Sequence, residues 1–340
     1  MERIAYRQRH LRTVSLFSGA GGLDLGFLNA GFDIVWANDI DKYAVEAYRH
    51  NISEHIVLGD INQLLDEIPE HEVLIGGFPC QPFSMMGQQL GFEDERGTLF
   101  FTIEQIVRRH RPRIIVLENV KNLETHDGGR TFARMQRILR EELLDDSGYG
   151  YEVFYQVLNS SDFGIPHTRR RVFVVAFDRG YFRETDINFE FPQPIELQQS
   201  LRDILDENVD KKYFLSEKIL PTILSHGTGN YYSRAEIDLD IARPLCATMH
   251  KMHRASQDNY VTDDYNRNRF EDTEDKRISN VRKLTPNECR KLQGFPSDWE
   301  FNISDTQAYR QFGNAVTVDV AYRVAMQIVR ALNIRLEIER

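Results

Sequence analysis

The chain has 340 residues, of which 41% are hydrophobic and 28% charged, and a formal net charge of −10. This composition is typical of a globular protein with a full core and, at this length, two domains. No apolar stretch approaches the length of a membrane span and residues 1–7 lack the apolar core of a signal peptide, which predicts a cytoplasmic protein without membrane contact. Three widely spaced cysteines, Cys80, Cys246 and Cys289, indicate neither a disulfide framework nor a metal site.

The distribution of charge matters more than its sum. A net negative charge argues against a polyanionic partner, because phosphate contacts need positive charge. Basic residues nevertheless cluster at 108–111, 167–171 and 276–291, while acidic residues concentrate at 203–210 and 263–275. Each basic cluster is compatible with an ordinary solvated surface or with a basic cleft on an acidic body.

Strands and helices alternate through the first part of the chain. Strands are predicted at 13–17, 33–37, 56–58, 72–75, 114–117, 153–158 and 172–177, and helices at 23–29, 42–50, 99–109 and 131–144. The strands are largely apolar, which is typical of a parallel sheet covered on both faces. The pattern predicts a doubly wound α/β domain whose ligands lie beyond the carboxyl ends of the strands.

The first three strands end in groups that suit an adenosine-bearing cofactor. The turn at 18–22, with three glycines, lets a ligand approach the backbone where a helix begins. Asp39 follows the second strand, roughly 20 residues beyond the glycines, a separation typical of a carboxylate that holds ribose hydroxyls. Asp60 follows the third strand and could accept a hydrogen bond from an adenine amino group. Both aspartates would serve equally as loop or helix-cap residues.

The fourth and fifth strands end in a thiol and a carboxyl group. Cys80 lies in the segment 76–84, where Pro79 and Pro82 restrict the backbone on both sides. Glu118 ends the fifth strand at the same sheet edge. A thiolate and an acid facing one cleft suit attack on an electron-poor ring whose nitrogen is protonated or hydrogen-bonded. The alternatives are a buried structural cysteine and a structural ion-pair partner.

Two arginines enter the last predicted strand. Arg169 and Arg171 alternate in the extended segment 164–171, so their side chains point to one side. Guanidinium groups so placed suit a base carbonyl or a phosphate.

Seven blocks of sequence, taken in order, resemble those of the DNA (cytosine-5) methyltransferases. They are residues 17–22, 76–84, 91–101, 118–122, 164–171, 282–296 and 311–316. The resemblance spans the chain except for about 180 to 280. It implies a doubly wound mixed sheet of the S-adenosylmethionine-dependent, Rossmann-like type in residues 1–183 plus 305–340. It also implies a smaller, mostly β or irregular target-recognition domain in residues 184–304. The apolar spacing of 318–332 predicts a helix that packs back on the first domain.

The resemblance assigns roles to residues. Cys80 would add to C6 of a cytosine flipped out of duplex DNA while Glu118 assists at N3, and Arg169 and Arg171 would hold the extruded base and its phosphate. The pocket for S-adenosylmethionine would comprise Phe17, Ser18, Gly19, Ala20, Gly21, Gly22, Asp39, Ile40, Asp60, Ile61, Pro79, Leu99, Asn314 and Ala315. DNA contacts are expected from Gln81, Ser84, Arg96, Arg234, Thr248, Lys251 and Arg254.

The chain departs from the family pattern at two places, and two alternative functions stand beside the main one. Relatives often carry Glu-Trp in place of Asp39-Ile40 and Gln in place of His167, with consequences that the sequence leaves open. A tRNA cytosine-5 methyltransferase is disfavoured because those enzymes typically carry Pro-Pro-Cys where this chain has Phe78-Pro79-Cys80. A non-catalytic DNA-binding relative is disfavoured by the intact catalytic set. The resemblance therefore implies a monomeric, sequence-specific bacterial or phage enzyme of a restriction-modification system, with a separate endonuclease and an unidentified recognition sequence.

Overall fold

The computed structural model describes residues 11–78, 99–183, 187–226, 232–251, 253–254, 256–270 and 278–338, with side chains described up to 332. The chain divides into two compact units. Met1–Leu158, Arg170–Gln193 and Val318–Arg340 form the first, and Asn159–Arg169 with Pro194–Thr317 form the second. Among helices in the described ranges, none is both long and apolar enough to cross a membrane.

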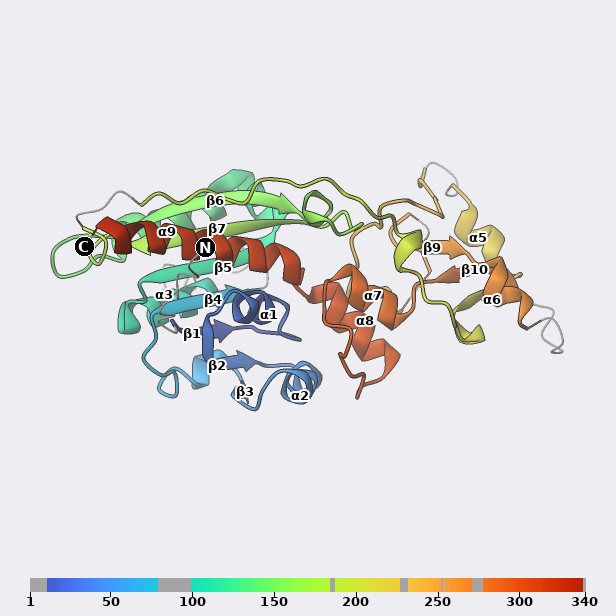
Figure 1. Ribbon diagram of the computed structural model, residues 1–340, viewed down its shortest axis with the longest axis horizontal. Coiled ribbons are helices and arrows are strands. Elements are labelled where there is room, and N and C mark those ends of the chain that lie inside the picture. Colours follow the sequence, from blue (N-terminus) through green and yellow to red (C-terminus); the bar gives the residue numbers. More distant parts are fainter. Residues whose placement is uncertain are drawn as a thin grey trace, which may run out of the picture. The chain divides into compact units, whose positions relative to one another are not determined.

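The first unit contains a seven-stranded sheet in the order β3-β2-β1-β4-β5-β7-β6 (Figure 1). Its strands are β1 (Arg12–Leu16), β2 (Asp33–Asp39), β3 (Ile56–Leu58), β4 (Val73–Gly77), β5 (Ile114–Val120), β6 (Tyr151–Asn159) and β7 (Arg170–Asp178). The neighbours from β3 to β5 run parallel, whereas β7 pairs with β5 in the antiparallel sense. This confirms the expected mixed, doubly wound sheet. The chain order reverses between β1 and β4, the point where open α/β sheets bind ligands.

Helices pack against this sheet because each buries an apolar side. They are α1 (Gly22–Asn29), α2 (Lys42–Asn51), α3 (Leu99–His110), α4 (Arg130–Arg137) and α9 (Val318–Ile338). The core joins apolar residues of β1, β4, β5 and β7 to those of α3 and α4.

One predicted helix changes character along its length. The expected helix at 131–144 is α-helical only in α4 and then widens into a π-helix at Ile138–Glu142. Arginines from α3 and the loop after it bind carbonyl oxygens at its end: Arg108 Nη1 lies 3.0 Å from the oxygen of Glu142, and Arg111 Nη1 lies 2.5 Å from that of Leu143. These distant donors offset the hydrogen bonds that the wider turn leaves unmade, a contribution that local sequence periodicity does not contain.

The second unit is built around a small antiparallel sheet. It has the order β8-β10-β9, formed by β8 (Phe214–Ser216), β9 (Tyr260–Thr262) and β10 (Ile278–Lys283). Its helices are α5 (Leu220–Leu224), α6 (Asp264–Asn268), α7 (Pro286–Leu292) and α8 (Asp305–Asn314). The buried Arg282 on β10 pairs with Glu288 of α7 at 2.8 Å and with Asp263 at 2.6 Å, which ties this sheet to its helices.

The last helix returns to the first unit. α9 packs against α1, as the apolar spacing near the C-terminus predicts. The two helices approach closely because α1 presents Gly26: a Cβ there would lie 2.5 Å from the Cβ of Ala321 and 2.6 Å from the nitrogen of Tyr322. Residues far apart in sequence thus complete one core.

We expect Gly26→Ala to lower the free energy of unfolding by about 1–3 kcal/mol, because the added methyl group forces α1 and α9 apart. Urea unfolding followed by circular dichroism measures this. Asn29→Ala, an exposed change on the same helix, is the control and should stay within about 0.5 kcal/mol of the wild type. Equal stability of Gly26→Ala and the wild type would contradict the close helix contact.

Candidate active site

The glycine turn after β1 has one open and one closed side. Phe17, Gly19 and Gly21 all have positive φ values, of 55°, 58° and 88°, which glycine adopts without strain and phenylalanine does not. A Cβ at Gly19 would meet nothing within 4 Å, whereas one at Gly21 would lie 2.3 Å from Cδ1 of Ile52. The backbone is therefore open to a ligand at Gly19 and packed against the protein at Gly21.

Asp39 at the end of β2 fastens this turn. Its Oδ2 accepts a hydrogen bond from the Gly19 nitrogen at 2.8 Å, and its Oδ1 accepts one from the Asp41 nitrogen at 2.7 Å. Burial raises the pKa of Asp39, with the two backbone donors acting in the opposite sense. Each carboxylate oxygen has a second lone pair, so Asp39 can hold the turn and still accept a ligand hydroxyl.

Asp60 is held by the turn that follows β3. The buried Asn38 donates from Nδ2 to the carbonyl oxygens of Val57 and Gly59, both at 3.0 Å, which fixes the backbone just before Asp60. Asp60 Oδ1 accepts from the nitrogen and from Nδ2 of Asn62, at 3.0 and 2.9 Å. The carboxylate thus has a set direction at the sheet edge.

Apolar side chains stand exposed beside these carboxylates. Ile40 is 71% exposed and Leu58, the cross-strand partner of Asp39, is 46% exposed. Exposed apolar surface next to two carboxylates and an open glycine turn matches the chemistry of a nucleoside, which offers an apolar ring, hydroxyls and an amino group. Ile40 supplies apolar area but not the flat ring that relatives often carry there. Of the other expected pocket residues, Ile61 is buried and Leu99 begins α3.

A carboxylate on β5 and a guanidinium on β7 form an ion pair in the same sheet. Glu118 on β5 is 7% exposed, and its Oε1 lies 3.0 Å from Nε of Arg171 on the antiparallel neighbour β7. On its other side Glu118 pairs in register with Gly77 of β4. The ion pair therefore lies one strand from the chain that leads to Cys80.

Asn119 fixes the exit of β4, a role that the sequence analysis missed. Its side chain is buried and donates from Nδ2 to the carbonyl oxygen of Phe78 at 2.8 Å. Phe78 precedes Pro79 and Cys80, so β5 positions the backbone that enters the cysteine segment. An amide directly after a strand-end acid was the available signal. Five expected site residues lie outside the described residues: Pro79, Cys80, Gln81, Ser84 and Arg96.

Arg169 binds backbone groups within its own unit. It belongs to the second unit, is 1% exposed, and donates to the carbonyl oxygens of Leu245, Gly313 and Ala315 at 3.2, 3.1 and 2.7 Å. Gly313 also packs tightly, since a Cβ there would lie 2.3 Å from the nitrogen of Ala247. The guanidinium thus joins two segments that are distant in sequence.

His167 supports the same segment. The ring is fully buried; Nε2 accepts from the Leu245 nitrogen at 3.1 Å, and Nδ1 lies 3.1 Å from the carbonyl oxygen of Leu292. Because Nε2 accepts, Nδ1 carries the proton and donates it. One donor and one acceptor are also what a glutamine amide offers, so the departure from the family pattern keeps the same hydrogen-bonding capacity.

The other expected contact residues of the second unit are mostly at its surface. Thr248 and Lys251 are exposed and share a turn, in which the Lys251 nitrogen donates to the Thr248 oxygen at 2.9 Å. Arg234 pairs with Glu236 at 2.5 Å, and Arg254 donates to Gln257 at 2.7 Å. Two cofactor candidates also lie here, Asn314, which is exposed at the end of α8, and Ala315, which is 8% exposed.

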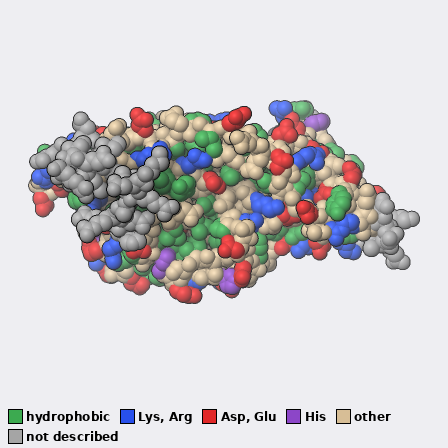
Figure 2. All heavy atoms as spheres, viewed as in Figure 1, with side chains coloured by type: hydrophobic (Ala, Val, Ile, Leu, Met, Phe, Trp, Pro, Cys, Tyr) green, Lys and Arg blue, Asp and Glu red, His purple; other side chains and the backbone are tan. Residues whose placement is uncertain are grey.

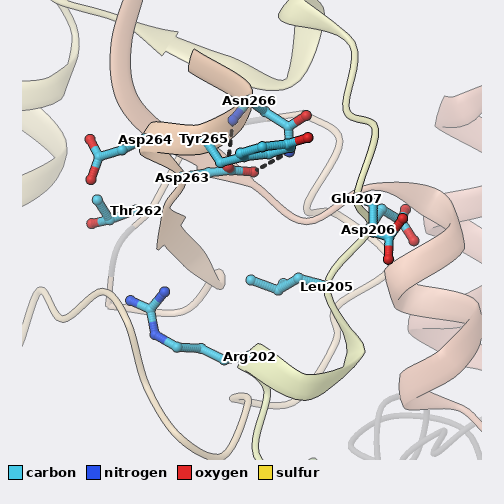
Figure 3. A pocket seen from close by; sticks show the side chains of 9 residues that line it. All are labelled: Arg202, Leu205, Asp206, Glu207, Thr262, Asp263, Asp264, Tyr265 and Asn266. Atoms are coloured by element: carbon cyan, nitrogen blue, oxygen red, sulfur yellow. Dashed lines mark hydrogen bonds between the residues drawn. The ribbon is translucent and has the colours of Figure 1, made fainter. Parts of the chain in front are cut away.

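The second unit also contains an acidic pocket, shown in Figure 3. It is lined by Arg202, Leu205, Asp206, Glu207, Thr262, Asp263, Asp264, Tyr265 and Asn266. Several of its polar groups bind one another: Asp263 caps α6 by accepting from the nitrogen and Nδ2 of Asn266, both at 3.0 Å. The pocket includes none of the expected site residues.

Acidic and basic side chains are interspersed on the face of the molecule in Figure 2.

Comparison with known proteins identifies the class. A family model described as C-5 cytosine-specific DNA methylase matches residues 11–330. The chain belongs to this family and is a DNA cytosine-5 methyltransferase. The family prediction is confirmed, and the tRNA and non-catalytic alternatives are not supported.

Individual relatives match over nearly their whole length. Type II methyltransferase M.NlaX of Neisseria lactamica is 38% identical, with 95% of this chain and 97% of the relative covered. Type II methyltransferase M.HhaI of Haemophilus parahaemolyticus is 35% identical, with 96% of each covered. The crystal structure of S. pombe Dnmt2 methyltransferase has a TM-score of 0.68 at 21% identity, covering 94% of this chain and 98% of that one. At that identity the likeness shows the fold alone.

We expect His167→Gln to retain nearly the wild-type stability and His167→Leu to lose about 1–3 kcal/mol for each backbone group left unpaired, at Leu245 and Leu292. Urea unfolding of the two variants, which keep similar volume, measures the difference. Equal stability of the two variants would show that the imidazole hydrogen bonds contribute nothing.

Proposed function

We propose that the protein methylates C5 of one cytosine within a specific sequence of duplex DNA, with S-adenosylmethionine as methyl donor, and so protects host DNA in a restriction-modification system. The observation that carries the proposal is the Glu118 carboxylate paired with Arg171 at the end of β5. It lies one strand from β4, whose exit toward Cys80 is held by Asn119. We also propose that the protein acts as a monomer and that a separate endonuclease recognises the same DNA sequence.

Cys80 and Glu118 share the activation of the base. The Cys80 thiolate adds to C6 of a cytosine that has been flipped out of the duplex. Flipping is needed because C6 of a stacked base cannot be reached by the thiolate. Glu118, which takes up a proton as the base binds, donates it to N3 while the electron pair of the C5–C6 double bond moves to C4–C5 and that of the C4–N3 double bond moves to N3, and the resulting enamine makes C5 nucleophilic. S-adenosylmethionine, when bound, supplies the electrophilic methyl group. Once C5 has taken this methyl group, with S-adenosylhomocysteine as the leaving group, a water molecule accepts the C5 proton. The C6–sulfur bond then breaks and N3 returns its proton to Glu118, which regenerates the Cys80 thiolate and leaves 5-methylcytosine.

Arg171 orients the carboxylate in this scheme. Its Nε lies 3.0 Å from one oxygen of Glu118 and so fixes the direction in which the carboxyl group faces. Once Glu118 has given its proton to N3, the guanidinium stabilises the carboxylate that remains, at a position that is only 7% exposed. We assign Arg171 to the catalytic group and Arg169 to a supporting role in the second unit, since its guanidinium donates to three carbonyl oxygens.

The cofactor is proposed to lie along the ends of β1, β2 and β3. The open backbone at Gly19 gives it access, Asp39 accepts from ribose hydroxyls, and Asp60 accepts from the adenine amino group. Ile40 and Leu58 cover the apolar ring. On the family resemblance we also propose that Asn314 and Ala315, which belong to the second unit, contribute to cofactor binding.

Recognition of the DNA sequence is proposed for residues 184–304. The exposed turn with Thr248 and Lys251 offers a hydroxyl and an ammonium group for base edges and phosphates. His167 and Arg169 both bind Leu245, three residues earlier, and so support this turn from within the second unit.

The covalent step has a direct test. Incubated with S-adenosylmethionine and duplex DNA containing 5-fluorocytosine, the wild-type enzyme should form a covalent adduct visible as a shifted band on a denaturing gel. The adduct persists because C5 then carries fluorine in place of the proton whose removal releases the enzyme, and fluorine cannot be removed as a positive ion. Cys80→Ala should form none. A folded wild-type protein that binds duplex DNA but forms no adduct would overturn the enzymatic mechanism. Bisulfite or nanopore sequencing of DNA from an expressing host would give the recognition sequence.

The division of roles has a second test. Glu118→Gln should bind the cofactor product S-adenosylhomocysteine with the wild-type affinity but methylate at least about 100-fold more slowly, because a general acid typically contributes 10²–10⁴-fold. Asp60→Ala should weaken that binding about tenfold, since a hydrogen bond to a charged group is lost. Calorimetry and single-turnover methylation measure the two effects. Equal loss of binding in both variants would contradict the assignment.

A further inference from the structure

A fully buried carboxylate lies beneath the glycine turn. Asp24, in the first turn of α1, is 0% exposed. Its Oδ2 accepts from the hydroxyl of Ser15 on β1, and its Oδ1 accepts from the hydroxyl of Tyr48 on α2, both at 2.9 Å. A strand and two helices thus share one acidic group.

The two hydroxyl groups that bind Asp24 are themselves hydrogen-bonded to further residues, Ser18 on one side and His55 on the other. The Ser18 hydroxyl, inside the turn, donates to Oγ of Ser15 at 2.8 Å. On the other side Nε2 of the half-buried His55 lies 2.8 Å from the Tyr48 oxygen. Since Tyr48 gives its proton to Asp24, His55 is the donor in that contact. When Asp24 is ionised, every proton in the network therefore points toward it.

The ring of Tyr48 also packs against the glycine turn. A Cβ on Gly21 would lie 3.0 Å from Cδ2 and from Cε2 of the Tyr48 ring, which is itself fully buried. The ring supports the closed side of the turn while its hydroxyl holds Asp24. At Gly19, by contrast, a Cβ would meet nothing within 4 Å.

Keeping this carboxylate ionised opposes folding. Burial raises the pKa of Asp24 to about 6, against the lowering effect of its hydrogen bonds to Tyr48 and Ser15. The folded state therefore binds the proton more tightly than the unfolded chain. The resulting penalty is present in full above about pH 6 and absent below about pH 4. A feature that lowers stability at neutral pH, in direct contact with the cofactor turn, points to a role other than stability.

We infer that Ser15, Asp24 and Tyr48 are positioning residues for the cofactor, which hold the turn from Phe17 to Gly21 in the conformation that leaves Gly19 open. They do not contact the ligand themselves. The inference rests on the proposed function and names the part of the fold that prepares its binding site.

The test is the affinity for S-adenosylhomocysteine, measured by calorimetry on the full chain. Tyr48→Phe removes one hydroxyl and keeps the ring against Gly21, and Ser15→Ala breaks the other arm. Each should raise the dissociation constant roughly tenfold, the effect expected when a charge-assisted hydrogen bond is lost. Affinity for unmethylated duplex DNA should stay unchanged, which separates this effect from general damage.

Two controls match these variants. Tyr43→Phe removes a hydroxyl from the same helix, and Gly26→Ala weakens the first unit at the contact of α1 with α9; both should bind S-adenosylhomocysteine like the wild type at a temperature where they are folded. Wild-type affinity in Tyr48→Phe and Ser15→Ala would overturn the inference, and so would an equal loss in Gly26→Ala. A wild-type protein that does not bind S-adenosylhomocysteine would instead overturn the proposed cofactor site, and with it this inference.

Discussion

Polar groups at the carboxyl ends of the parallel strands must be satisfied, and in this protein they satisfy one another across strands. Asp39 at the end of β2 binds the turn after β1, and Asn38 binds the turn after β3. Asn119 at the end of β5 binds the exit of β4, and Glu118 pairs with Arg171 on β7. Each strand end is therefore positioned by its neighbour. Because a candidate functional side chain follows almost every one of these ends, the same hydrogen bonds that complete the sheet also prepare the site.

The second unit uses the same principle with longer connections. His167 and Arg169 bind backbone groups at 245, 292, 313 and 315, all within that unit. Buried backbone groups without partners are costly, so side chains with several donors are effective where chain segments of irregular structure meet. A guanidinium that satisfies three carbonyl oxygens replaces the regular ladder that a larger sheet would supply.

Local pattern was a good guide where the cause of structure was local. Apolar runs and their spacing gave the strands from β1 to β7 and the helices α1 to α3 to within three residues at each end, since each buries a continuous apolar face. The π-helical turn after α4 was not predicted, because the groups that stabilise it come from α3 and the loop after it. For Asn38, Asn119 and Tyr48 the reason is similar: their partners lie 19 to 41 residues away in the chain. Arg169 shows the limit most clearly, since alternation along an extended segment predicts a direction but not what lies there.

The sequence by itself determined the family and the chemical identity of the candidate site. Ordered blocks carry the thiol, the strand-end carboxylates and the glycine turn, because a reaction needs particular functional groups and a turn needs particular backbone freedom. Only the tertiary structure decided which groups are paired, which are buried and which remain open. Arg171 meets Glu118 because β7 runs antiparallel to β5, and Asp24 is hydrogen-bonded on both oxygens beneath the turn because β1 and α2 each bring a hydroxyl to it. Burial and pairing depend on chain segments that are distant in sequence, so they emerge only when the chain is folded.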